Sequence, residues 1–470
     1  MLPPPGESEP ALYGGSRLRS DPAAPPPTAY DGLAVAVPPG AADAAAVAGM
    51  GPDEQGIAAA IAAESGWMTE VLADLVRCPT VLGREEPGQA VMREAFRAIG
   101  LEPVDVPMDP AALRAHPAAS PFDWDVSGKS NVVATWSPSG PAEGRSLILN
   151  GHVDVVPPEP LDRWAHDPFA AVIEGEWLSG RGAADMKCGL AAILGAVKGL
   201  RALGLTPRAP VHLESVVEEE CTGNGTLQTI LAGYVADGAI IAEPFGGAIT
   251  TSQVGVLWFS VRIEGLPGHA AESGRAANAI EQSFTVIEAL RALETELNAS
   301  PPPPYDRYPY PIALNVGTIH GGDWQSSVPD ACTIGCRIAL YPGMRIEDLQ
   351  GRIEAIVADV AAREPAAFPR PPQVLYGGFR APGYEIARDH PLVGTLAGAY
   401  ARRHGVPPAL VATTGTTDAR VFGEAAGMPA VCFGPYAEQA HGLGERVYLP
   451  SVVQTAQVMG IAIRDWCGLS

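Results

Sequence analysis

Residues 146–157 read Ser-Leu-Ile-Leu-Asn-Gly-His-Val-Asp-Val-Val-Pro. The first half is a short apolar run typical of a buried strand, and the second half places His152 and Asp154 just beyond that strand. In α/β sheets, ligands collect at the carboxyl ends of the strands. A histidine followed two residues later by a carboxylate can bind a metal while the aspartate orients its ring. Taken alone, the pattern also fits an ordinary histidine at a strand end.

Predicted strands and helices alternate on both sides of this stretch. Helical patterns run from about Asp53 to Leu75 and over 89–99, and Gly100 follows the second as a C-terminal cap. Apolar runs predict further strands over 131–136, 211–217 and 238–242, with an Ala/Leu-rich helix over 189–203. This alternation predicts an α/β domain with a mostly parallel sheet between helices.

The pattern changes after residue 250. A strand over 254–264, a long helix over 276–297, strands over 312–319 and 331–340, and a helix over 346–362 predict a small α+β insert. After a Pro-rich stretch the α/β pattern resumes, with a helix over 390–404 and strands near Val411 and Val431. We therefore expect a Pro/Ala-rich arm without a packed core over 1–50, a catalytic domain in two parts (51–250 and 371–470), and an inserted domain over 251–370.

Composition excludes several classes of protein. Against 53 Asp and Glu the chain has 31 Lys and Arg, so its formal net charge of −22 argues against nucleic-acid or anionic-membrane partners. No apolar run approaches the roughly 20 residues that span a bilayer, and no signal peptide is recognisable. Seven cysteines, an odd number, predict no disulfide framework, and Cys332 and Cys336 are interpreted as small core hydrophobes. We expect a cytoplasmic protein.

Four further positions could carry chemistry, each with a simpler alternative. Asp185 opens an Ala-rich helix after a Gly-rich turn, where it could also be an N-cap. Glu218–Glu220 follow a predicted strand, although three adjacent carboxylates are usually a solvated charge run. Glu243 ends an apolar strand before Pro244, and His441 lies in a polar segment with Glu445 just beyond.

Together these positions supply imidazole and carboxylate ligands without a thiolate, a set that suits zinc, cobalt or manganese. A bridging carboxylate, with a histidine and a carboxylate for each ion, makes a two-metal site with ions ~3.5–4 Å apart. A spare carboxylate can then act as a base on water. The sequence therefore predicts a hydrolase with two divalent metal ions per subunit.

At this point the chain resembles the family of zinc-dependent metallopeptidases that includes acetylornithine deacetylase, succinyl-diaminopimelate desuccinylase and carboxypeptidase G2, over roughly residues 55–470. The family pattern Gly-His-x-Asp-x-Val-Pro matches 151–157, and Gly-Arg-Gly-x-x-Asp-Met-Lys-x-Gly matches 180–189. The family's Glu-Glu pair, its Glu-Pro and its C-terminal histidine match Glu219–Glu220, Glu243-Pro244 and His441.

The resemblance implies a role for each matched residue. His152 and Glu243 would bind one metal and Glu220 and His441 the other, with Asp185 bridging them. Asp154 would orient His152, Glu219 would be the general acid/base, and the Asp185–Met186 peptide bond would be cis.

The resemblance also assigns a role to the insert, which in this family forms dimers and closes over the active site. His269 matches a histidine that reaches the neighbouring subunit's active site and polarises the scissile carbonyl, although a surface loop histidine is the simpler alternative. Arg337 matches the arginine that holds the substrate carboxylate, and Gly415 and Thr416 begin a substrate loop. Ser326 departs from the asparagine that many members carry there, which indicates a different or larger acyl or amine group.

These features predict a homodimeric deacylase that cleaves the amide bond of an N-acyl amino acid or a related carboxylate-bearing small molecule. A dipeptidase or carboxypeptidase of the same family remains open, because the metal site is the same for both. An inactive binding protein would be expected to lose a ligand or the base. A phosphoesterase would need a nearby basic cluster, which the sequence lacks.

Overall fold

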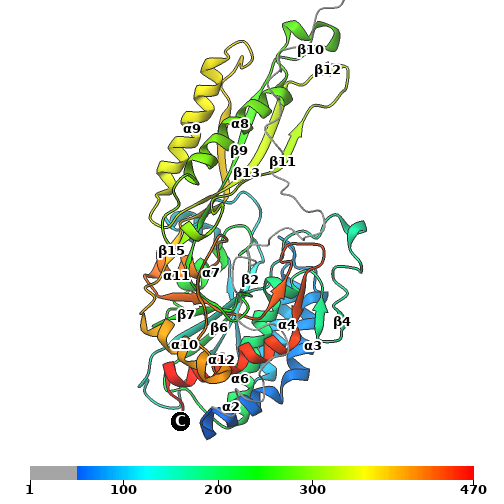
Figure 1. The fold of residues 1–470 in the computed structure, drawn as a ribbon. Helices are drawn as coiled ribbons and strands as arrows, with labels where there is room; N and C mark the ends of the chain where they lie inside the picture. Colours follow the sequence, from blue (N-terminus) through cyan, green and yellow to red (C-terminus); the bar gives the residue numbers. More distant parts are fainter. Residues whose placement is uncertain (1–49) are drawn as a thin grey trace, which may run out of the picture.

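The computed structural model describes residues 50–470, so the predicted arm over 1–50 lies outside the described residues apart from Met50. The chain forms two lobes (Figure 1), a body and an insert that stands away from it. Each lobe has its own hydrophobic core. The predicted α/β class with an α+β insert is confirmed. Within the described residues, no helix is both long and apolar enough to cross a membrane.

Helices cover both sides of the body's main sheet (Figure 1). On one side α6 (Cys188–Ala202) and α12 (Leu449–Cys467) pack together, with α2 (Pro52–Ala62) and α3 (Ser65–Arg77) beside them. On the other side lie α7 (Asn224–Leu231) and α11 (Ala419–Ala426). The apolar stripe predicted as one helix from Asp53 to Leu75 is two helices. The remaining body helices are α4 (Glu86–Ala98), α5 (Pro110–Ala115) and α10 (Pro391–His404).

The main sheet is mixed: parallel in its middle and antiparallel towards both sides. Its strand order is β1-β2-β6-β3-β7-β17-β8-β15, and β16 also pairs with β8. The neighbours β6, β3 and β7 are parallel, so their carboxyl ends meet at one edge. The strands are β1 (Pro103–Pro107), β2 (Ser130–Trp136), β3 (Leu147–His152), β6 (Val211–Val216), β7 (Ala239–Ile241), β8 (Ile249–Gln253), β15 (Tyr384–Glu385), β16 (Leu410–Thr413) and β17 (Ala430–Cys432).

A second, small sheet of the body joins segments far apart in sequence. Its order is β18-β19-β5-β4, formed by β4 (Val172–Glu174), β5 (Trp177–Ser179), β18 (Ala437–Glu438) and β19 (Arg446–Tyr448). In its register Arg446 pairs with Ser179. The loop after β5 and the loop between β18 and β19 are thereby held side by side.

The insert is an antiparallel sheet of order β11-β13-β9-β14, with two long helices packed against it. The elements are β9 (Gly255–Glu264), α8 (Ala279–Leu297), β11 (Leu314–Gly321), β13 (Ala331–Leu340), α9 (Ile346–Arg363) and β14 (Gln373–Ala381). The sequence interpretation did not include β14. The short pair β10 (Gly268–His269) and β12 (Ser327–Val328) lies at the end of the insert farthest from the body (Figure 1).

Candidate metal centre and active site

Two groups of ligand-type side chains meet at the carboxyl edge of the main sheet. His152, Asp185 and Glu243 form one group, and Asp185, Glu220 and His441 form the other. Within each group the ligand atoms lie within 4.8 Å of one another, and Asp185 belongs to both. The sequence separated these five residues into five motifs, and the parallel strands and the small sheet bring them together.

The first group is buried around His152 at the end of β3. Its Nε2 lies 3.3 Å from Asp185 Oδ1 and 3.6 Å from Glu243 Oε1, yet this buried atom makes no well-formed hydrogen bond within the described residues. Burial opposes protonation, but the carboxylates of Asp185 and Glu243 outweigh it and raise the pKa of His152 well above its usual value. Such a cluster of carboxylates around an imidazole suits a bound cation.

The second group lies nearer the surface. His441 Nε2 is 3.1 Å from Glu220 Oε1 and 3.2 Å from Asp185 Oδ2. The carboxylate of Glu220 raises the pKa of His441 well above its usual value. With one histidine and one unshared carboxylate on each side of Asp185, the residues fit two divalent ions that share this bridging ligand.

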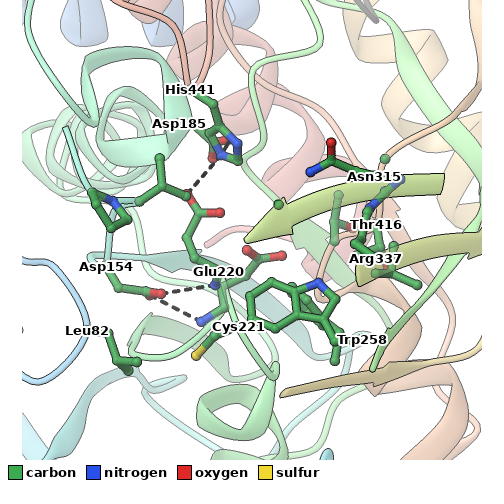
Figure 2. A pocket seen from close by; sticks show the side chains of 18 of the residues that line it. Leu82, Asp154, Asp185, Glu220, Cys221, Trp258, Asn315, Arg337, Thr416 and His441 are labelled. Carbon is green, nitrogen blue, oxygen red and sulfur yellow. Dashed lines mark hydrogen bonds and ion pairs between the residues drawn. The ribbon is translucent and has the colours of Figure 1, made fainter. Parts of the chain in front are cut away.

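Asp154 contacts the site in two ways. Its backbone carbonyl lies 3.0 Å from His152 Nδ1, whereas its carboxylate is 3.6 Å from that atom. The carboxylate instead accepts hydrogen bonds from the backbone N–H groups of Glu219 (3.2 Å) and Glu220 (3.0 Å), as Figure 2 shows. Asp154 therefore links the strand end that carries His152 to the turn that carries the two glutamates.

Glu219 belongs to neither ligand group. Its carboxylate lines the same cavity and lies 3.8 Å from His152 Nε2. Burial raises the pKa of Glu219 well above its usual value. Its position beside both ligand groups is the one that a general acid/base would need.

The three consecutive glutamates do not form a solvated charge run. Glu218 turns away from the ligands, with a backbone φ of +63°, and is fully buried. It accepts from Lys129 Nζ at 2.6 Å and from the indole N–H of Trp124 at 2.8 Å. Since Trp124 also lines the cavity, Glu218 anchors one of the cavity's walls.

Glu445, noted in the sequence only as lying near His441, holds the loop that carries Asp185. Its buried Oε1 accepts from the backbone N–H groups of Gly182 (2.9 Å), Ala184 (3.0 Å) and Asp185 (3.1 Å). The other oxygen pairs with Arg181, whose guanidinium also donates to the carbonyl of His441 at 3.3 Å. The Asp185–Met186 peptide bond is cis, as expected.

A cavity of about 850 Å³ extends from the ligand groups to the insert's sheet. Arg337, Gly415 and Thr416 line it, so the structure brings these three predicted substrate residues to the ligand groups. Burial lowers the pKa of Arg337, and no residue in the described part of the chain forms an ion pair or side-chain hydrogen bond with its guanidinium. Asn315, Trp258 and Phe379, which the sequence interpretation missed, also line the cavity.

His269 and Ser326 lie elsewhere. Both are exposed at the β10–β12 pair: His269 ends β10 and Ser326 directly precedes β12, and the N–H of Ala270 donates to the carbonyl of Ser326 at 3.0 Å. Neither lines the cavity of its own chain. The two predicted residues are therefore neighbours of each other, at the tip of the insert (Figure 1).

Fold and site together define a metal-dependent hydrolase that acts on carbon–nitrogen bonds. The profile of peptidase family M20/M25/M40 matches residues 148–465, and the chain belongs to this family. The resemblance stated from the motifs is thereby confirmed. The cluster around Asp185 agrees with the dinuclear metal centre of this family, of which a dinuclear metal-binding peptidase from Bacillus subtilis is a solved example.

The curated relatives include several deacylases. The chain is 31% identical to N-formyl-4-amino-5-aminomethyl-2-methylpyrimidine deformylase of Halalkalibacterium halodurans, covering 74% of this chain and 85% of the relative. It is 30% identical to acetylornithine deacetylase of Yersinia pseudotuberculosis (73% and 85%). It is 28% identical to succinyl-diaminopimelate desuccinylase of Dinoroseobacter shibae (84% and 97%).

Solved structures share the fold at lower identity. The dipeptidase Dug1p of Saccharomyces cerevisiae superposes with a TM-score of 0.70 at 16% identity, covering 88% of this chain and 98% of that one. Human carnosine dipeptidase 1 superposes with a TM-score of 0.68 at 15% identity, covering 89% and 99%. Both likenesses concern the fold alone.

Proposed function

We propose that the protein is a dinuclear metal-dependent deacylase that hydrolyses the amide bond of an N-acyl amino acid or a related small amide with a free carboxylate. The observation that carries this proposal is Arg337. Arg337 lines the same cavity as the ligand groups, and its guanidinium has no acidic partner among the described residues. A partly buried cation without a counter-ion is costly, so a carboxylate on the substrate would compensate it.

The five ligand residues would hold two divalent ions, zinc first, with cobalt or manganese as alternatives. His152 and Glu243 would bind one ion and Glu220 and His441 the other, with Asp185 shared. Bound there, the ions supply Lewis acidity, which lowers the pKa of water and polarises the amide carbonyl.

Glu219 would move the protons of the reaction. It takes a proton from the water that attacks the carbonyl carbon, and later gives one to the leaving nitrogen as the carbon–nitrogen bond breaks. The products are a carboxylic acid and a free amine. Asp154 would keep Glu219 and Glu220 in place through their backbone N–H groups.

The remaining roles concern substrate binding and assembly. Arg337 would pair with the substrate carboxylate, and the Gly415–Thr416 loop would border it. Because His269 and Ser326 lie at the tip of the insert, they would act in the cavity of a second copy, which makes the proposed enzyme a homodimer. His269 would there donate a hydrogen bond to the carbonyl oxygen.

The test is a substrate panel. Protein loaded with zinc or cobalt, and protein stripped with a chelator, would be assayed on N-formyl, N-acetyl and N-succinyl amino acids, on dipeptides and on the same compounds with the carboxylate converted to an amide. We expect metal-dependent hydrolysis of the carboxylates and poor hydrolysis of the amides. Preference for dipeptides would favour the dipeptidase alternative, and no hydrolysis of any compound would refute the proposal.

Arg337→Met sharpens this test. It should raise the KM for carboxylate substrates at least about tenfold, because it removes a charge-assisted contact, while substrates without the carboxylate change little. Arg345→Met is the matched control, since Arg345 is an arginine of the same lobe with a side chain that is 71% exposed. Equal effects of the two variants would count against the role of Arg337.

A further inference from the structure

One row across the insert's sheet delivers three different side chains to the cavity. Asn315 on β11 pairs with Arg337 on β13, and Arg337 pairs with Trp258 on β9. Directly paired residues point to the same face of an antiparallel sheet, with Cβ atoms ~4.5–5.5 Å apart. All three line the cavity, and Figure 2 shows them on the side away from Asp185 and His441. We call these three residues the recognition row.

The indole of Trp258 packs against residues of the neighbouring strand β14. The pairing of β14 with β9 shifts register between Tyr376 and Arg380, and Gly378 within this irregularity has a φ of +77°. A Cβ on Gly378 would lie 2.4 Å from the Trp258 ring, so only glycine leaves room for the indole there. Phe379 packs edge-on against the same ring at 5.3 Å between centroids. The indole is therefore fixed beside Arg337.

A ligand held by its carboxylate at Arg337 must place the neighbouring atoms of its skeleton near the rest of the row. In an amino acid, the side chain begins one carbon away from the carboxylate. The residue that flanks Arg337 on one side is an indole, and Phe379 and Trp124 add apolar surface to the same cavity. An anionic side chain here would lose its hydration, because no Arg or Lys other than Arg337 is among the residues that line the cavity, whereas a flat or bulky apolar side chain would gain contact area.

We propose that the recognition row selects substrates whose carboxylate-bearing half is an amino acid with an aromatic or large aliphatic side chain. This inference rests on the proposed deacylase function and narrows its substrate class. Arg337 pairs with the carboxylate, Asn315 donates its amide N–H to the second carboxylate oxygen, and Trp258 stacks against the side chain.

The kinetic test compares substrates within each protein. The ratio of kcat/KM for N-acetyl-L-phenylalanine to that for N-acetyl-L-alanine does not depend on the fraction of folded enzyme. In the native protein we expect a ratio of at least about ten, the size of effect that one apolar group has in a hydrophobic pocket. Trp258→Ala should bring the ratio close to one. Trp67→Ala, which removes an indole that faces Lys198 on the body outside the cavity, should leave the ratio unchanged.

A binding test works without catalysis. Calorimetric titration of the metal-free protein with 3-phenylpropionate and with propionate compares a carboxylate that carries a ring with one that does not. We expect 3-phenylpropionate to bind at least roughly tenfold more tightly, and this advantage to disappear in Trp258→Ala. Asn315→Ala should weaken both ligands by a similar factor, since its contact is with the carboxylate.

The outcomes separate the two proposals. Hydrolysis of N-acyl amino acids with no preference for phenylalanine, or with a preference that survives Trp258→Ala, overturns the recognition row and leaves the deacylase intact. Absence of hydrolysis together with a Trp258-dependent advantage of 3-phenylpropionate overturns the deacylase and supports the row. Preference for N-benzoylglycine over N-acetylphenylalanine would place the aromatic group on the acyl side, which also overturns the row as proposed.

Discussion

The buried carboxylate of Glu445 accepts a hydrogen bond from the backbone N–H of Asp185 at 3.1 Å, although 260 positions separate the two residues in the chain. Some residues hydrogen-bond to a metal ligand without binding the metal themselves. Replacing such a residue typically lowers metal affinity or activity by about 10–100-fold. Glu445→Gln keeps one oxygen for the backbone N–H groups but removes the charge that pairs with Arg181. We expect it to weaken metal binding by a factor in that range, measured by calorimetric titration with zinc.

The matched control is Glu438→Gln on the neighbouring strand β18. Glu438 also pairs with an arginine, Arg446, at 2.7 Å, but it contacts no backbone of the Asp185 loop. Its replacement should leave zinc affinity within about twofold of the native value, as surface ion pairs contribute little. Equal losses in the two variants would mean that the hydrogen bonds from the Asp185 loop to Glu445 have no special role in metal binding.

The adjacent residues Glu219 and Glu220 should respond differently to the same change. Glu219→Gln keeps size and removes the base, so kcat should fall by at least about 10²–10⁴ with little change in KM. Metal content should stay near two ions per subunit, because Glu219 belongs to neither ligand group. Glu220→Gln should lose one ion and activity together. Metal analysis beside steady-state kinetics would expose reversed roles, and activity in both variants would refute the hydrolase mechanism.

Exchange of subunits tests whether His269 acts in a partner's cavity. His269→Ala protein mixed with Glu219→Ala protein should regain activity, because each mixed dimer contains one cavity with Glu219 and a His269 supplied from the other chain. The control mixes Glu219→Ala with the His269→Ala/Glu219→Ala double variant, which can form no complete site. If subunits exchange and activity does not return, His269 does not act across a dimer.

Glu214 on β6 should make stability fall as pH rises. Burial raises the pKa of Glu214 from 4.5 to about 8. The hydrogen bond that Asn150 donates at 3.0 Å lowers this pKa, but burial has the larger effect. Between these two values the folded protein binds the proton and the unfolded chain does not, so the free energy of unfolding decreases with increasing pH. The fall is up to about 1.4 kcal/mol per pH unit.

Glu214→Gln is neutral at every pH and removes this contribution. Urea unfolding at about pH 5 and about pH 8 should show the variant gaining stability relative to the native protein across that window. A difference in stability between the two proteins that stays constant over the window would contradict the raised pKa.

Local patterns in the sequence were enough to predict the fold class and to single out the five segments that carry the ligand groups, while the choice of Glu220 within Glu218–Glu220 came from the resemblance to the family. Each motif ends a strand or fills a Gly-rich turn, and both features are visible in a few consecutive residues. Strand β14 was missed because it follows the Pro-rich stretch 369–372 and contains Gly377 and Gly378. A glycine pair inside a strand weakens its pattern, and here it marks an irregularity in the pairing.

Apart from Arg337, Gly415 and Thr416, which the resemblance to the family supplied, the cavity wall could not be predicted in the same way. The strands that carry Asn315, Arg337 and Trp258 were all expected, but their mutual register was not, and a shift of one residue would turn each side chain to the opposite face. Register here depends on an irregular pairing near Val316 and Thr318. Likewise, Glu218 points away from the ligand groups because its own backbone is left-handed, and the run of three glutamates does not reveal this.

The run Glu218–Glu220 has a consequence for redesigning this protein. Glu218 accepts a hydrogen bond from Trp124, Glu219 is the proposed base and Glu220 belongs to a ligand group. These three roles therefore depend on one short segment of backbone. Enlarging the cavity at Trp124 would disturb the segment that carries the chemistry. Trp258 comes from the other lobe and shares no backbone with those carboxylates. Directed evolution towards new substrates should therefore find its tolerated changes in the insert, while the glutamate segment stays fixed.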